Sequence, residues 1–292
     1  MKTIALTLGD SAGIGPEIVD AALHSGKLPT QFNYRVIGER VGNAGQPDES
    51  TARAALAALE EVATLVRNGE IAAVVTGPVS KARLQQIGFA FPGQTEFFAD
   101  RWHSPNHAMC LTGGSLTVAL VTAHIPLKNV SASLNPAEII RVGVLLAEFL
   151  ARLHDQRTHP RIAVAGLNPH AGEDGGLGLE EIQMISPALT ILQAEYGHLA
   201  TFKGPLSPDT VFHRAVSGEF DGVLCMYHDQ GLIPLKLHAF DEGVNVTLGL
   251  PHPRTSPDHG TAFQLAGKNL ARPNSMIAAI QLAARLVDPN QP

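Results

Sequence analysis

Cysteine is scarce in this sequence, with only two, Cys110 and Cys225, among 292 residues. Both lie in apolar runs that are typical of buried strands. Free cysteines in such runs behave as small hydrophobic side chains, and disulfides are rare in reducing compartments. We therefore predict two buried thiols and no disulfide framework.

Long apolar runs and basic blocks are also missing. No stretch approaches the roughly 20 apolar residues of a membrane-spanning helix. The apolar run in the N-terminal MKTIALTLGD is too short for a secretory signal peptide. The formal net charge is −6, without a cluster of lysines and arginines, so nucleic acid and anionic membranes are poor partners. We expect a cytoplasmic protein that binds neither nucleic acid nor membranes. A few individually placed lysine or arginine side chains would hold any anionic ligand.

Strand-like apolar runs alternate with helical patterns along most of the chain, which predicts an α/β protein with a mostly parallel sheet. Gly113 and Gly114 separate two apolar runs and indicate an antiparallel hairpin within it. The length suffices for one large domain or two smaller ones. The expected strands are 4–8, 34–38, 71–75, 108–112, 116–122 and 161–166, and the expected helices are 51–67, 136–153, 179–196 and 275–287.

Residues 223–262 concentrate the polar chemistry of the chain. This stretch contains two strand-like runs, 223–226 and 244–250, with Asn245 inside the second, and the two cations Lys236 and Arg254. A guanidinium binds phosphate or carboxylate through paired hydrogen bonds, and an ammonium acts as a compact charge. The alternative is ordinary solvation at the surface, which is the weaker interpretation for Arg254 among Pro, Thr and Ser residues. We predict that this stretch contributes to an active site.

Three of the thirteen histidines, His124, His170 and His228, each follow an apolar run within a few residues. Ligands of open α/β sheets bind beyond the carboxyl ends of strands. Three imidazoles placed there can converge on one divalent cation and leave a fourth position open. For any one histidine a structural role is the safer interpretation, but the shared placement favours a metal site. Asp229 and Glu173 are candidate hydrogen-bond partners that would orient these imidazoles.

Two other segments carry weaker signals. Residues 9–17, GDSAGIGPE, join the first strand to a helix. Because this is not GxGxxG, a ligand site and a tight turn are equally good interpretations. Thr95 precedes a helix expected at 97–102, and we predict that it caps that helix.

Seven motifs, in this order, resemble the 4-hydroxythreonine-4-phosphate dehydrogenase family of pyridoxal phosphate biosynthesis. They are TGPVSK (76–81), GQTEFF (93–98), AHIPL (123–127), GLNPHAGE (166–173), YHDQG (227–231), GVNVTLGLP (243–251) and RTSPDHGTA (254–262). The resemblance runs from the first strand to the last helix and is highly specific.

The resemblance implies an isocitrate/isopropylmalate-dehydrogenase-like fold of two α/β/α domains with a central cleft. It also implies a homodimer in which both subunits form each active site. On this basis we expect residues 1–110 and 268–292 to form the first domain. The second, residues 111–267, would carry the metal and most substrate residues.

The resemblance also assigns the ligands, residue by residue. It implies one divalent metal per site, zinc, magnesium or cobalt, with one of its three ligands coming from the partner subunit. The implied metal ligands are His124, His170 and His228. The implied substrate-binding residues are Gln94, Thr95, Lys236, Asn245 and Arg254.

Two further assignments concern catalysis and the cofactor. Lys236 and Asp229 are the candidate catalytic residues, and Lys236 either assists proton transfer or binds an acidic group. NAD or NADP would bind at a loop that resembles the adenosine-binding loop of the wider fold family, formed by His259, Gly260, Thr261 and Ala262.

The implied reaction is oxidation of 4-phosphohydroxy-L-threonine and decarboxylation to 3-amino-2-oxopropyl phosphate. The nicotinamide cofactor takes the hydride from the carbon that bears the hydroxyl. The metal lowers the pKa of that hydroxyl and then polarises the new ketone, which lets carbon dioxide leave.

The chain departs from the family pattern at three places. Gln94 stands where the family usually has histidine, and an amide cannot carry charge. Ser11 stands where proline is common, and the region between Gly38 and Thr51 is short. A paralogue that acts on threonate or erythronate 4-phosphate is therefore the first alternative. Two hypotheses from other functional classes are a metal-dependent hydrolase and a non-catalytic binding protein. The presence of all the candidate site residues argues against the non-catalytic binding protein.

Overall fold

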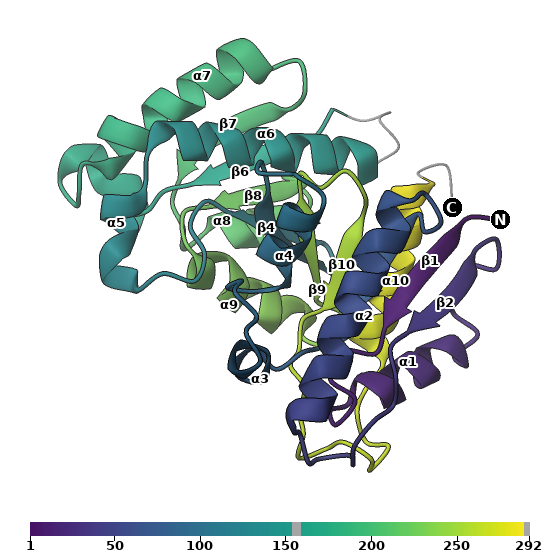
Figure 1. Cartoon of the computed structure of the whole chain (residues 1–292). Helices are drawn as coiled ribbons and strands as arrows, with labels where there is room; N and C mark the ends of the chain where they lie inside the picture. The colour runs from purple at the N-terminus through teal and green to yellow at the C-terminus, as the bar shows by residue number, and fades with distance from the viewer. Residues whose placement is uncertain (154–158, 289–292) are drawn as a thin grey trace. The chain divides into compact units, whose positions relative to one another are not determined.

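The computed structural model describes residues 1–153 and 159–288. The chain divides into two compact units, and Figure 1 labels many of their helices and strands. Unit 1 comprises Met1–Pro105 and Asp241–Pro292, and unit 2 comprises Asn106–Phe240. Each unit has its own arrangement of strands with helices packed on them.

Unit 1 has the strand order β2-β1-β3-β10-β9. β1 pairs in parallel with β2 and β3, and β10 pairs in parallel with β3 and antiparallel with β9. Its elements are β1 (Thr3–Thr7), α1 (Gly15–Leu23), β2 (Asn33–Ile37), α2 (Glu49–Arg67), β3 (Ala73–Thr76), α3 (Lys81–Gln86), α4 (Gln94–Arg101), β9 (Val244–Leu248), β10 (Arg254–Pro257) and α10 (Asn274–Val287).

The alternation of side chains along β10 puts Arg254 and Thr255 on opposite faces of the unit 1 sheet. The guanidinium carbon of Arg254 lies 5.9 Å from the centre of the Phe98 ring, which belongs to the apolar core formed with α2. Thr255 donates a hydrogen bond from Oγ1 to the carbonyl of Ala279 in α10, at 2.8 Å. Unit 1 therefore has three layers, and Arg254 faces the α2 and α4 side.

Unit 2 has the strand order β4-β5-β8-β6-β7. β4 and β5 form an antiparallel hairpin, and β8 pairs in parallel with both β5 and β6. Its elements are β4 (Ala108–Gly113), β5 (Leu116–Leu120), η1 (Leu127–Asn129), α5 (Val130–Ser133), α6 (Pro136–Leu153), β6 (Arg161–Ala165), η2 (Pro169–Gly175), η3 (Glu181–Ile185), α7 (Ser186–Tyr196), β7 (Thr201–Leu206), α8 (Val211–Val216), β8 (Gly222–Cys225) and α9 (His228–Ala239).

Unit 2 is also layered. Val223 and Cys225 pack in a core cluster with Val211 of α8 and Leu232 of α9. Leu224, between them in β8, points to the other face. There α6 packs so closely that a Cβ added to Gly143 would lie 3.4 Å from the Leu224 side chain. The parallel strands β5, β8 and β6 thus end at one edge, between the helices of the two faces.

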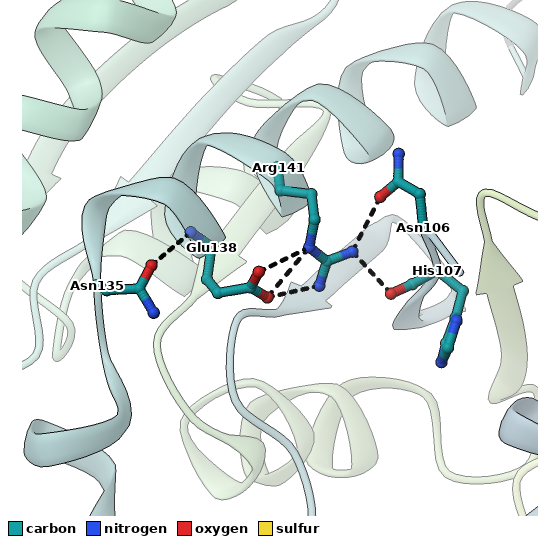
Figure 2. Close-up of polar contacts among 5 residues, drawn as sticks. All are labelled: Asn106, His107, Asn135, Glu138 and Arg141. Carbon is teal, nitrogen blue, oxygen red and sulfur yellow. Dashed lines mark hydrogen bonds and ion pairs between the residues drawn. The ribbon is translucent and has the colours of Figure 1, made fainter. Parts of the chain in front are cut away.

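Arg141, in α6, fixes the segment that leads into β4, as Figure 2 shows. Its Nη1 donates to the side-chain oxygen of Asn106 at 3.1 Å and to the carbonyl of His107 at 2.8 Å. Its Nη2 donates to the Glu138 carboxylate at 2.7 Å. At the start of α6 the side chain of Asn135 accepts from the backbone N–H of Glu138 at 2.9 Å. This cluster anchors the first residues of unit 2 on α6.

Several sequence predictions are confirmed. The protein is of the α/β class, and the hairpin around Gly113 and Gly114 is present. Cys110 and Cys225 are free and buried, and burial raises the pKa of both thiols. Within residues 1–153 and 159–288, no helix combines the length and the apolar character needed to cross a membrane.

The unit boundaries differ from the predicted domains. The sequence prediction assigns residues 241–267 to the second domain, but they lie in unit 1. The physical reason is strand pairing, because β10 pairs with β3 and α10 packs against β10. As a result Asn245 and Arg254 belong to unit 1, whereas the three candidate metal ligands belong to unit 2.

Candidate functional site

The three candidate metal ligands follow strands that end at one edge of the unit 2 sheet. His124 follows β5, His170 lies in η2 after β6, and His228 begins α9 after β8. Because β8 is the parallel neighbour of both β5 and β6, the carboxyl ends of the three strands lie side by side. The fold thus brings three segments that are spread over about a hundred residues of sequence to the same edge.

His124 and His228 face each other, and we call them the histidine pair. Their ring centres are 5.4 Å apart, with the ring planes inclined at 43°. Nδ1 of His228 lies 2.7 Å from Oδ1 of Asp229. A carboxylate that accepts from Nδ1 fixes the ring and leaves Nε2 as the nitrogen with a free lone pair. The histidine pair therefore has the donor chemistry of a cation site, with Asp229 orienting one ligand.

His170 does not complete a three-ligand site within the chain. Among the residues that the structure describes, no three His, Cys, Asp or Glu side chains are placed to hold a metal together. His170 is exposed and opens a run with positive φ: 52° at His170, 52° at Ala171, 81° at Gly172, 43° at Glu173 and 53° at Asp174. Left-handed backbone costs roughly 1–2 kcal/mol per non-glycine residue. Surrounding contacts must therefore hold this turn in place.

Lys236 is partly buried on α9, about two helical turns after His228. The helix begins at His228, directly after the N-cap residue Tyr227. One helix thus carries a candidate metal ligand, its carboxylate partner Asp229 and the candidate proton-transfer residue.

A second group of polar side chains surrounds Arg254 in unit 1. Nη2 of Arg254 donates to Oγ1 of Thr76 at 2.6 Å and to Oε1 of Gln94 at 2.9 Å. Nη1 donates to Oγ1 of Thr247 at 3.4 Å, and the hydroxyls of Thr247 and Thr95 are 3.2 Å apart. We call these five residues the Arg254 cluster. It joins Gln94, Thr95 and Arg254, which the sequence analysis named as substrate-binding residues.

The guanidinium of Arg254 is buried against neutral acceptors. Arg254 is 3% exposed, and the hydrogen bonds described above go to hydroxyl and amide oxygens. Within the described parts of the chain, its buried Nε has no hydrogen-bond partner. Burial lowers the pKa of Arg254 to about 10, and the charge of Glu96 opposes that shift. A buried cation with an unused donor has the chemistry of an anion site.

The helix cap predicted at Thr95 is wrong. Helix α4 begins at Gln94 after the N-cap Gly93, and no side chain caps it. Gly93 takes the extended conformation that starts the helix, which leaves the Thr95 hydroxyl to face Thr247. The Gln94 amide is hydrogen-bonded at both of its polar atoms. Its Oε1 accepts from Arg254, and its Nε2 donates to the carbonyl of Gly77 at 3.3 Å.

Asn245 lies two residues before Thr247 in β9, so both side chains point to the same face of the strand. Its Oδ1 is buried and has no hydrogen-bond partner among the described residues. An unused acceptor on the same strand face as Thr247, which binds Arg254, suits a ligand that offers both an anionic group and a hydroxyl or ammonium group.

The candidate nucleotide loop, formed by residues 259–262, packs against the first loop of unit 1. The backbone N–H of Ile14 donates to the carbonyl of Thr261 at 2.9 Å. A Cβ added to Gly13 would lie 2.7 Å from the same oxygen, so only glycine fits there. Ala262 has a φ of 41°, a conformation rare for non-glycine residues. The two segments that the sequence analysis treated separately are thus neighbours.

A hollow of ≈ 380 Å³ adjoins these loops. The residues that line it include Ser11, Glu17, Asp20, Arg40, Gly267 and Asn269. Oε2 of Glu17 accepts from the backbone N–H groups of Gly267 at 3.2 Å and Asn269 at 3.3 Å. Its other oxygen, Oε1, is buried and has no hydrogen-bond partner in the described structure. An unused acceptor on a residue that lines the hollow suits a ligand that carries hydroxyl groups.

Three further residues of these sites, Thr76, Thr247 and Glu17, were not predicted from the sequence. Thr76 and Thr247 had a detectable signal. Thr76 ends the otherwise apolar strand AVVT, and Thr247 in VNVTL lies two positions after Asn245, on the same face of the strand. Glu17 is an acidic residue in the first turn of α1, and this is where carboxylates commonly stabilise a helix. Nothing in the sequence separates that role from its contacts with residues 267–269.

Comparisons with known proteins agree with this geometry. The profile of the family described as "Pyridoxal phosphate biosynthetic protein PdxA" matches residues 16–283. A 4-hydroxythreonine-4-phosphate dehydrogenase of Zymomonas mobilis is 42% identical, over 97% of this chain and 95% of that protein. The crystal structure of a 4-hydroxythreonine-4-phosphate dehydrogenase from Klebsiella pneumoniae is similar, with a TM-score of 0.83 and 35% identity. That similarity covers 99% of this chain and 100% of that one.

The predicted isocitrate-dehydrogenase-like fold is confirmed by a more distant similarity. An isocitrate dehydrogenase from Methylococcus capsulatus has a TM-score of 0.50 and 16% identity, over 98% of this chain and 85% of that one, a likeness of fold alone. The profile match and the near-complete coverage of close relatives decide the family. This chain belongs to the PdxA family of pyridoxal phosphate biosynthetic proteins.

Proposed function

We propose that this protein oxidises 4-hydroxythreonine-4-phosphate, the activity for which its relatives in Zymomonas and Klebsiella are named. The carbon that bears the hydroxyl gives up a hydride to NAD or NADP and becomes a ketone. The resulting β-keto acid loses carbon dioxide, and the carbon left behind takes up a proton to give 3-amino-2-oxopropyl phosphate.

The observation that carries this proposal is the Arg254 cluster. Its guanidinium is buried among neutral acceptors and keeps Nε unused, so an anionic group of the substrate would complete its hydrogen bonding. Thr76 and Thr247 supply hydroxyls, and Asn245 adds an unused acceptor in the same strand as Thr247. We assign phosphate binding to Arg254 and Thr95, and recognition of a hydroxyl or amino group to Asn245.

The histidine pair fits a divalent cation. Imidazole ligands suit zinc and cobalt, whereas magnesium prefers oxygen ligands, so we propose zinc or cobalt as the resident metal. When bound, the metal would polarise the substrate oxygen and the nicotinamide would accept the hydride. Asp229 fixes the ring of His228 through its 2.7 Å contact with Nδ1.

The third metal ligand is proposed to come from a second copy of the chain. One copy places two of the three imidazoles together, which leaves His170 to serve the site of a partner. Large apolar side chains are exposed beside all three histidine segments, a pattern expected of a surface that another protein covers. They are Ile125, Leu127, Leu177, Leu179, Ile182, Ile233 and Leu237. We therefore propose a homodimer with shared metal sites.

NAD or NADP is proposed to bind beside residues 259–262. The buried Oε1 of Glu17 needs a donor, and a ribose hydroxyl is one. Gly13 keeps the first loop close to Thr261, so the backbone of both loops is available to the dinucleotide.

Lys236 is proposed to handle the proton. Loss of carbon dioxide leaves a carbon that must be protonated, and an ammonium group can donate that proton. Lys236 lies on α9, the helix that begins with His228, so it shares one helix with a proposed metal ligand.

The direct test is an assay of NADH or NADPH formation with 4-phosphohydroxy-L-threonine. The protein is first depleted of metal with a chelator and then supplied with zinc, cobalt or magnesium. We expect nucleotide reduction only with substrate, nucleotide and metal together. Substrate hydrolysis without nucleotide would contradict the proposal and support a metal-dependent hydrolase. Equal rates with and without metal would contradict the histidine assignment.

A second candidate substrate is threonate or erythronate 4-phosphate, and one observation favours it. Gln94 stands in place of the usual family histidine and accepts from Nη2 of Arg254, so this chain departs from its family within the proposed substrate site. Reduction of NAD with these acids but not with 4-phosphohydroxy-L-threonine would establish the alternative.

The substitution Gln94→His is expected to raise kcat/KM for 4-phosphohydroxy-L-threonine about tenfold. An imidazolium that hydrogen-bonds the substrate phosphate contributes about 1.4 kcal/mol more than a neutral amide, a factor of ten. The measurement is kcat/KM for this substrate in both proteins, with thermal unfolding as a check on folding. An unchanged kcat/KM would show that Gln94 does not limit the use of this substrate.

A further inference from the structure

Glu181 is a buried carboxylate that holds the segment leading to His170. It is 3% exposed. Its Oε1 accepts from the backbone N–H groups of Leu167 and Asn168, both at 2.7 Å. Its Oε2 accepts from Nδ2 of Asn168 at 2.9 Å. These bonds tie down the residues between the end of β6 and His170.

The same carboxylate also limits the turn on the far side of His170. A Cβ added to Gly172 would lie 2.5 Å from Oε2 of Glu181, and one added to Gly166 would lie 3.2 Å from Oε1. Gly172 has a φ of 81°, which favours glycine independently. Glu181 therefore contacts the chain on both sides of His170, and glycine at position 172 lets the turn close around it.

A second support runs through Asn168. Its Nδ2 also donates to Oε2 of Glu180 at 2.7 Å, and Oε1 of Glu180 accepts from the hydroxyl of Ser131 at 2.6 Å. These hydrogen bonds, with that from Ser131 the strongest, lower the pKa of Glu180. Glu180 thus connects the turn to α5, whereas Glu181 begins η3, a single π-helical turn of the kind often found at functional sites.

We propose that Glu181 is a positioning residue for the metal site, because it sets the backbone that aims His170. This inference rests on the proposed metal function. His170 is exposed, and its ring direction depends on a left-handed turn that needs outside support. A ligand that must reach the site of a second copy depends especially on such support. Glu181 acts through the backbone at Leu167 and Asn168 and contacts neither metal nor substrate.

Two substitutions test this inference, one at Glu181 itself and one in the turn that Glu181 contacts. Glu181→Gln keeps the size of the side chain, but its NH2 group cannot accept, so one of the three bonds is lost in one orientation of the amide and two in the other. Gly172→Ala leaves Glu181 intact and disturbs the turn instead. Glu195→Gln is the matched control, since Glu195 is an exposed glutamate of α7.

The readout is cobalt binding to metal-depleted full-length protein, followed by the visible absorption of bound Co²⁺. We expect Glu181→Gln and Gly172→Ala to weaken binding about 10- to 100-fold, the usual effect of losing a group that orients a metal ligand. Hydrogen exchange at the amides of Leu167 and Asn168 should become faster in Glu181→Gln. High cobalt should restore kcat, which a merely misfolded protein would not allow. Glu195→Gln should match the wild type.

Three outcomes decide the matter. Wild-type cobalt affinity in Glu181→Gln would overturn the inference and leave the metal site standing. Weaker binding without faster exchange at Leu167 and Asn168 would also overturn it, because the effect would not pass through those amides. No cobalt binding by the wild type would overturn the proposed metal site and this inference together. If Glu181→Gln does not fold, Gly172→Ala decides by the same affinity measurement.

Discussion

Replacing Arg254 with methionine is expected to lower kcat/KM about 1000-fold while the stability of the protein stays nearly the same. Two charged hydrogen bonds to a bound anion contribute about 4 kcal/mol, which corresponds to that factor. Methionine roughly fills the space of the side chain and removes a buried charge that neutral acceptors only partly compensate. Removing this buried charge relieves its desolvation cost, which offsets the hydrogen bonds lost to Thr76, Gln94 and Thr247.

The measurements for Arg254→Met are steady-state kinetics and thermal unfolding without substrate. Arg35→Met is the matched control, because Arg35 in β2 is an exposed cation paired with Glu61 at 3.3 Å. The control should retain its activity and its unfolding temperature. A large fall in the unfolding temperature of Arg254→Met would mean that Arg254 is a structural residue, and full activity would remove it from the substrate site.

The substitution His228→Ala is expected to abolish tight metal binding and to lower kcat on the order of 1000-fold, with the fold retained. A metal that polarises a reacting oxygen stabilises the transition state by several kcal/mol. The remaining partner, Asp229, is 68% exposed and stays solvated, so the substitution leaves no buried charge behind. Metal-free protein should therefore unfold at nearly the wild-type temperature.

Metal content after dialysis, kcat and thermal unfolding with and without zinc are the measurements for His228→Ala. In the wild type, zinc should raise the unfolding temperature, because a ligand that binds only the folded state stabilises it. That increase should be missing from the variant. His198→Ala, at an exposed histidine of the same unit, should behave as the wild type. Full activity of metal-depleted His228→Ala would refute the metal assignment.

The sequence predicted that each of the three histidines follows a strand, but it did not predict which two of them face each other. An apolar run followed by a polar residue is a local pattern, so the placement of His124, His170 and His228 after strands was visible. Which strands are neighbours is not local. The order β5-β8-β6, with His228 next to His124 and His170 on a separate turn, depends on packing that no short window of sequence records.

Elements with unusual composition were also hard to predict. Helix α9 contains Gly231 and Pro234, residues that normally oppose a helix interior, and its helical pattern was therefore not seen. Strand β10 is only RTSP, which resembles a loop, and its pairing with β3 is what moves residues 241–267 into unit 1. The contact between Arg254 and Gln94 spans 160 positions and follows only from that pairing.

The alternation of Arg254 and Thr255 on β10 also restricts how this protein can change in length during evolution. Adding or deleting one residue in the turn between β9 and β10 would shift the register of β10 by one position. Such a shift would move a guanidinium under α10 and a threonine into the anion site. We therefore expect an insertion or deletion of one residue in 249–253 to cost far more activity than one in the loop between β2 and α2.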